Sequence, residues 1–267
     1  MLLIHVHHLT ALGTYTSLSG IWIELPLLVP LLSESWQLPA KLSLVISFAS
    51  IAPILIVIYR HGRVKNERAL EQQQFMVVSL ENDKENKTRS IKSEYFLLLC
   101  ILFLISTLLY GIIPSINSYT LYPHGIKLFH YTVIAGYLSY PLISLIGVFI
   151  PEVSTKVIYL LTFIGILIFV YIFLNAKLSP CPLLVDTMSG KVLISFMWVM
   201  IILIFSYERV ALGNYFCRTH GHNGLLWFGL LTQLGSLLGA MLIYLLTVTF
   251  KLFKEQNFCE RLSCGKL

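Results

Sequence analysis

The sequence predicts an all-α integral membrane protein, a polytopic helix bundle with about seven transmembrane helices. Hydrophobic residues make up 57% of its 267 residues, and charged residues only 12%. A soluble domain usually carries about a quarter charged residues, so this chain has too few polar groups to cover a water-facing surface. The mean hydropathy of +0.79 and a series of long apolar runs agree with this class.

Seven apolar runs are long enough to cross a bilayer, which takes roughly 20 residues. The first has no basic stretch before it and no small-residue cleavage site, so we expect a retained span rather than a signal peptide. The polar segment 60–94 is expected to be a hydrated loop. The expected organisation is two helices in 1–59, this loop, a five-helix bundle in 95–253 and a tail in 254–267. The runs are 9–30, 39–59, 95–116, 128–150, 157–176, 188–207 and 224–250.

Lysine and arginine in the loops set the expected orientation, because cytoplasmic loops carry an excess of these residues. The segment 60–94 holds eight of them, which places it in the cytoplasm together with 151–156 and 208–223. The N-terminus is then cytosolic and the C-terminal tail extracellular. The pI near 9.0 follows from these cations, and their spacing does not indicate nucleic-acid binding.

The first run contains the sequence SGIWIELPLLVP, in which Glu24 is a carboxylate among apolar residues. A charge near the centre of a bilayer is costly, so such a group usually faces a cavity, a pathway or a partner. The alternative is that Glu24 lies near a helix end and contacts headgroup water, which Pro26 and Pro30 favour. Trp22 has the same two interpretations, because tryptophan is common at membrane interfaces.

The last run places Gly235 and Gly239 four residues apart, which is typical of close helix packing. Gln233 carries the only amide in that run, and we expect it to point into the bundle.

The sequence offers few signals of an enzyme or a metal site. There is no phosphate-binding glycine loop, HExxH motif or paired CxxC motif, so we expect neither an enzyme nor a metal site. The histidines of HVHH, residues 5–8, are expected at the membrane interface. Cys259 and Cys264 lie close together in the expected extracellular tail, where an oxidising environment allows a disulfide between them. Two free thiols are the alternative.

Several distinctive segments follow one another along the chain: GIWIELPLLVP (20–30), GIIPSINSYTLYPHG (111–125), FHYTVIAGYLSYPL (129–142), FSYERV (205–210) and LLWFGLLTQLGSLLGA (225–240). In this order they resemble the eukaryotic riboflavin transporters, solute carrier family 52. The resemblance implies facilitated uptake of riboflavin (vitamin B2) across the plasma membrane by alternating access. Its implied partners are riboflavin and the lipid bilayer, and it implies no cofactor.

The resemblance also implies a substrate site. Aromatic side chains would stack on the flat flavin ring, and carboxylate, amide and hydroxyl groups would bind its polar edge and its ribityl chain. Ser19, Tyr110 and Tyr140 each stand where the family pattern has asparagine, so three amides of that pattern are replaced here. The residues that the pattern and their chemistry suggest for substrate binding are Tyr15, Ser19, Trp22, Glu24, Asn117, His130 and Gln233.

The chain is shorter than the family pattern of about eleven spans, whose third to sixth spans have no counterpart here. Three interpretations follow. In the first, the chain is a diverged carrier that assembly as a homo-oligomer could complete. In the second, it is a truncated, transport-inactive isoform or fragment, because alternating access usually needs two halves that rock against each other. In the third, it is a seven-span receptor-like protein, and the expected cytosolic N-terminus argues against this interpretation.

Overall fold

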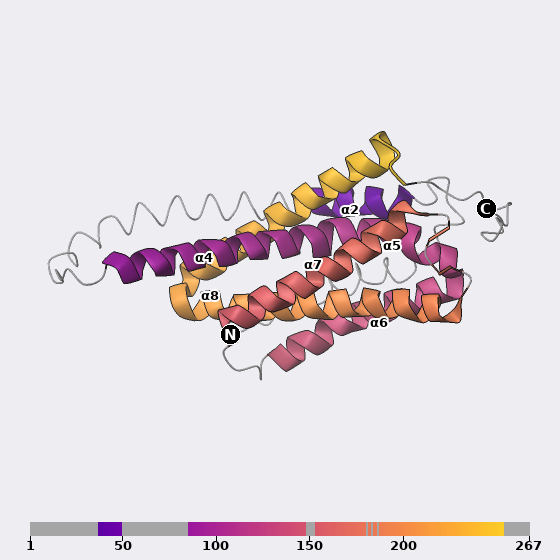
Figure 1. The fold of residues 1–267 in the computed structure, drawn as a ribbon. Coiled ribbons are helices and arrows are strands. Elements are labelled where there is room, and N and C mark those ends of the chain that lie inside the picture. The colour runs from indigo at the N-terminus through magenta and orange to yellow at the C-terminus, as the bar shows by residue number, and fades with distance from the viewer. Residues whose placement is uncertain are drawn as a thin grey trace, which may run out of the picture.

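The computed structural model describes residues 37–49, 85–147, 153–179, 181–182, 184–185 and 187–253, and every element within them is helical (Figure 1). In chain order these are α2 (Leu38–Ala49), α4 (Glu85–Ser106), the π-helical turn η3 (Thr107–Ile112), α5 (Ile113–Leu121), the 3₁₀ turn η4 (Tyr122–His124), α6 (Ile126–Gly147), α7 (Thr155–Lys177), α8 (Met188–Tyr244) and the π-helical turn η5 (Leu245–Thr249).

Four of the described helical stretches are long and apolar enough to cross a membrane. They confirm the all-α membrane class and correspond to four of the seven expected runs. Helix α2 is a shorter apolar helix at the start of the run 39–59, and α6 covers most of the run 128–150 but is not among the four. The run 9–30 lies outside the described residues, so the count of about seven stays a prediction. The four stretches are Ser93–His124, Thr155–Lys177, Met188–Thr219 and Gly224–Thr249.

Two helix boundaries differ from the sequence-based expectation. Helix α4 begins at Glu85, inside the segment 60–94 that was expected to be a loop. Helix α8 continues through 208–219, which was also expected to be a loop, and two of the four stretches belong to it. Figure 1 shows the chain reversing direction within α8, so that its yellow C-terminal part runs back from its orange N-terminal part. Charged residues ended the expected spans, but helical hydrogen bonding does not stop at a charge.

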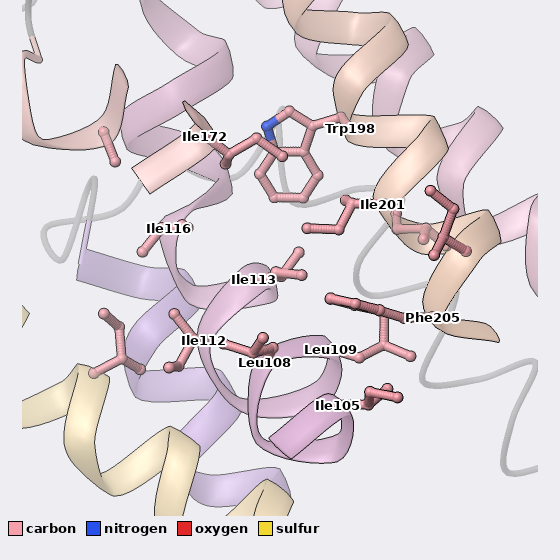
Figure 2. Close-up of a cluster of buried hydrophobic side chains, with 14 of the residues drawn as sticks. Ile105, Leu108, Leu109, Ile112, Ile113, Ile116, Ile172, Trp198, Ile201 and Phe205 are labelled. Atoms are coloured by element: carbon pink, nitrogen blue, oxygen red, sulfur yellow. The ribbon is translucent and has the colours of Figure 1, made fainter. Parts of the chain in front are cut away.

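The core lies where α4, η3 and α5 pack against α7 and α8 (Figure 2). Its side chains recur every three or four residues, which places them on one face of each helix. Between helices in a bilayer this packing gains van der Waals contact rather than hydrophobic burial, because lipid is as apolar as the core. Residues of this core include Ile105, Leu109, Ile112, Ile113 and Ile116 from the first three elements, Ile172 from α7, and Trp198, Ile201 and Phe205 from α8.

The outer face of α7 shows the pattern expected of a lipid-facing helix. Leu160, Phe163, Leu167, Val170 and Leu174 are all exposed and follow one another at helical spacing. An aqueous protein would bury such a row, whereas a bilayer solvates it. The exposed row therefore supports the membrane location of this helix.

Glycines set the closest contact between helices. A Cβ atom added at Gly239 would lie 2.4 Å from the carbonyl oxygen of Thr107, and one at Gly235 would lie 2.8 Å from that of Phe103. A Cβ atom added at Gly111 would lie 2.6 Å from the Cα of Gly239. The expected close packing at the G-x-x-x-G sequence is confirmed, and its partner is the segment from α4 into η3.

Candidate functional site

Two neighbouring ionisable residues, Glu208 and Arg209, lie within the membrane-spanning part of α8. Glu208 has no exposed surface, and Arg209 is partly buried. Consecutive residues of a helix point in different directions, so the two side chains meet different neighbours. Ionisable residues at membrane depth are rare and usually functional, which makes this pair the first site to consider.

The carboxyl of Glu208 faces α7. Its Oε1 lies 3.2 Å from the hydroxyl of Thr162, and its Oε2 has no hydrogen-bond partner. The same hydroxyl lies 2.9 Å from the backbone carbonyl of Ile158. A hydroxyl has one hydrogen to donate, so Thr162 can serve only one of these two oxygens at a time.

A glycine on α7 makes this approach possible. A Cβ atom at Gly165 would lie 2.3 Å from the ring carbon Cε1 of Phe205. Gly165 is three residues after Thr162, and Phe205 is three residues before Glu208, so the two contacts are neighbours on the same helix faces. The absent side chain at Gly165 therefore lets α7 and α8 approach closely beside the carboxyl.

The guanidinium of Arg209 points to a different set of groups. It donates a hydrogen bond to the hydroxyl of Tyr110, and its Cζ lies 4.6 Å from the centre of the Tyr110 ring and 5.7 Å from that of Phe228. Phe228 belongs to the returning part of α8, and Tyr110 to the π-helical turn η3. A cation above aromatic faces is stabilised by the ring quadrupoles, so Arg209 joins three segments of the bundle.

Tyrosines extend this cluster onto α6. The rings of Tyr110 and Tyr140 are stacked, with centres 6.4 Å apart and planes 19° apart. The ring of Tyr137 lies 6.0 Å from that of Tyr140. The two positions at which tyrosine replaces the asparagine of the family pattern are therefore in contact with each other, and one of them binds Arg209. Sequence inspection found the replacements but could not show that they meet.

Three of the residues proposed for substrate binding are described, and they lie on three different helices. Asn117 on α5 is only 3% exposed and its Oδ1 has no hydrogen-bond partner. His130 on α6 is partly buried and its Nδ1 has no hydrogen-bond partner. Gln233 on α8 is partly buried, and its expected direction into the bundle stays a prediction. Among the described residues, no hydrogen bond links these three side chains to one another.

A hydrogen bond from a tryptophan lies about one helical turn from Asn117. The Nε1–H of Trp198 on α8 donates to the hydroxyl of Thr120 at 3.1 Å. Thr120 is three residues after Asn117, on the same side of α5. This hydrogen bond fixes α5 against α8 near the unpartnered Asn117 oxygen.

The remaining expected site residues, Tyr15, Ser19, Trp22 and Glu24, lie outside the described residues and stay predictions. The expected disulfide between Cys259 and Cys264 lies outside them as well. Cys181, in the loop before α8, is disulfide-bonded, and its partner is not among the described residues. In the described part of the chain, no three His, Cys, Asp or Glu side chains cluster as metal ligands do.

Sequence reasoning missed Glu208 and Arg209 as site residues, because both were assigned to a loop after the sixth apolar run. The available signal was the continuation of the sequence: uncharged residues follow the two charges from Val210 to Cys217. A single charged step inside a longer apolar stretch is compatible with a helix that buries the charges against other helices.

Comparison with known proteins agrees with the resemblance. The model of the family described as solute carrier family 52, riboflavin transporter, matches residues 1–80 and 62–255. These two pieces overlap within the polar segment 60–94.

Curated relatives match as well. The chain is 37% identical over 160 residues to riboflavin transporter 2 of Salmo salar, covering 60% of this chain and 35% of the relative. It is 33% identical over 169 residues to member 3-B of Danio rerio, covering 63% and 37%, and 35% identical over 156 residues to member 3 of Homo sapiens, covering 58% and 33%. No solved structure matches. Each match spans about a third of the length of the relative. The chain belongs to solute carrier family 52, the riboflavin transporters.

Proposed function

We propose that this multi-pass membrane protein mediates facilitated uptake of riboflavin across the plasma membrane by alternating access. The observation that carries the proposal is the family match, which extends over most of the chain. The proposed orientation has a cytosolic N-terminus and an extracellular C-terminus, from the loop charges. Transport of this kind needs no covalent step, only a polar site at membrane depth that opens to each side in turn.

Buried polar groups without internal partners support the proposed site. The Oδ1 of Asn117 is an acceptor inside the bundle that no described residue satisfies. A buried polar atom without a partner is costly, so such atoms often mark a place for a ligand or water. A hydroxyl of the ribityl chain is a donor of the required kind. The stacked rings of Tyr110 and Tyr140 show that this part of the bundle accommodates flat aromatic groups, the class to which a flavin ring belongs.

The second candidate is a transport-inactive form of a riboflavin transporter. The observation that favours it is length, because the matched region covers 35% and 37% of the first two relatives. A carrier that alternates between two states usually needs two halves. Assembly as a homo-oligomer is the arrangement that would reconcile the shorter chain with transport.

Uptake of labelled riboflavin by starved cells that express the chain separates the two candidates. Protein at the cell surface together with uptake above that of untransfected cells supports the carrier, and surface protein without uptake supports the inactive form. Asn117→Ala should lower uptake at unchanged surface level. Asn175→Ala is the matched control, because Asn175 is also a buried amide with an unpartnered Oδ1 but lies in the last turns of α7. Equal loss in both variants would contradict a substrate role for Asn117.

A further inference from the structure

The carboxyl of Glu208 is the one acidic group that the described structure buries completely. A carboxylate transferred from water to an apolar interior loses its hydration, and this loss is tolerated only when a cation or several donors replace it. Glu208 has one hydroxyl near Oε1 and no hydrogen-bond partner at Oε2. These surroundings are far too poor in donors to hold a negative charge.

The nearest cation does not compensate this carboxyl. Arg209 is the next residue of α8, but its guanidinium binds the hydroxyl and ring of Tyr110. Within the described chain, the polar contact of the Glu208 carboxyl is the hydroxyl of Thr162. The other titratable or charged side chains that the structure describes on α8 and on the helices packed against it are Lys41 on α2, Glu94, Tyr95 and Cys100 on α4, Tyr119 on α5, Lys127, His130, Tyr131, Tyr137 and Tyr140 on α6, Lys156, Tyr159, Tyr171 and Lys177 on α7, and Lys191, Tyr207, Tyr215, Cys217, Arg218 and Tyr244 on α8 itself.

The hydrogen bonds around Thr162 are consistent with a neutral acid. Its hydroxyl lies 2.9 Å from the carbonyl of Ile158, a shorter distance than the 3.2 Å to Oε1 of Glu208. If the hydroxyl donates its single hydrogen to Ile158, its lone pairs face Glu208 and can only accept. A protonated carboxyl supplies the missing donor, whereas a carboxylate would face those lone pairs with its own.

The small number of oxygen atoms around Glu208 argues against a bound metal cation that would balance a negative carboxylate. Hard cations take six or more oxygen ligands in proteins, and this position offers a single carboxyl and one hydroxyl. A proton needs only one acceptor. The site is therefore suited to a proton and poorly suited to a metal cation.

We propose that Glu208 is a proton-binding site within the contact between α7 and α8, occupied by a proton while the two helices are packed together. Separation of the helices would admit water to the carboxyl and release the proton. The contact is then sensitive to pH, independently of which solute the protein carries.

Infrared difference spectroscopy of the chain at neutral pH, in a detergent without ester groups, tests the proposal. A protonated buried carboxyl gives a C=O stretching band that a carboxylate lacks. We expect the unmodified chain to show a band of this kind that is lost in Glu208→Gln, which keeps the shape of the neutral acid. Glu94→Gln removes a partly exposed carboxyl on α4 and should leave the band in place. A spectrum that is the same with and without Glu208 would overturn the proposal.

A second variant covers the case in which Glu208→Gln does not fold, an outcome that would itself count against a neutral side chain at this position. Thr162→Val keeps the size of the side chain and removes the hydroxyl. The acid band should persist and shift to higher frequency, because the proton loses its acceptor. A band that is absent from both the unmodified chain and Thr162→Val would show that Glu208 is ionised, contrary to the proposal.

Discussion

The substitution Gly239→Ala tests the packing of the bundle most directly. The added Cβ atom would lie 2.4 Å from the carbonyl oxygen of Thr107 and 3.2 Å from the Cα of Gly111. Both atoms belong to the backbone, so no flexible side chain can turn away. The helices must separate, and overpacking of this kind costs about 1–3 kcal/mol. The equilibrium constant for unfolding should rise by roughly 5- to 140-fold.

The same helix offers a matched control in Gly229. A Cβ atom there would meet nothing within 4 Å. Alanine has the higher helix propensity, so Gly229→Ala should be neutral or stabilising by up to about 1 kcal/mol. The two variants make the same chemical change in the same helix, and only the surroundings differ.

Thermal unfolding of the purified chain in detergent, followed by gel filtration after heating, measures both variants. We expect a lower transition temperature for Gly239→Ala and an unchanged or higher one for Gly229→Ala. Gly111→Ala should resemble Gly239→Ala, and the double variant should lose less than the sum, because the two residues share one contact. Equal transition temperatures for Gly239→Ala and Gly229→Ala would refute the close approach.

Two further substitutions probe the polar contacts by the same unfolding measurement. Arg209→Lys keeps the charge but loses the planar guanidinium over the Tyr110 ring, so we expect destabilisation by about 0.5–2 kcal/mol; an unchanged transition would show that the cation–aromatic contact contributes nothing. Trp198→Phe removes the donor to Thr120 and part of a buried ring, so the free energy of unfolding should fall by about 1–3 kcal/mol. Trp227→Phe, at an exposed position, should lower it little. A larger loss for Trp227→Phe than for Trp198→Phe would contradict the assigned burial.

The membrane class and most helix positions could be predicted from the sequence. The run 157–176 differs from α7 by only a residue or two at each end, because hydropathy and helix length respond to the same bilayer. The packing role of Gly235 and Gly239 was also predictable, since small residues four apart form one face. Their partner in η3 was not, because a one-dimensional pattern does not say which helices meet.

The site around Glu208 and Arg209 could not be predicted in the same way. A hydropathy window treats an ionisable residue as the end of a span. In the structure, Glu208 instead contacts α7 and Arg209 contacts η3 within the bundle. Such contacts join residues far apart in sequence. The π-helical turn that presents Tyr110 is likewise a product of packing, because no local signal in TLLYGI specifies it.

The glycine contact has a consequence for the biogenesis of the protein. Gly111 is synthesised long before Gly239, and the hydrogen bond from Ser47 to Ser236 joins residues 189 apart. At ordinary rates of translation the earlier helices wait on the order of ten seconds for the last span to leave the ribosome. During that interval their small-residue surfaces must be covered by lipid or by the insertion machinery. Chains that terminate before Gly235 therefore never acquire this partner, and we expect cellular quality control to degrade them.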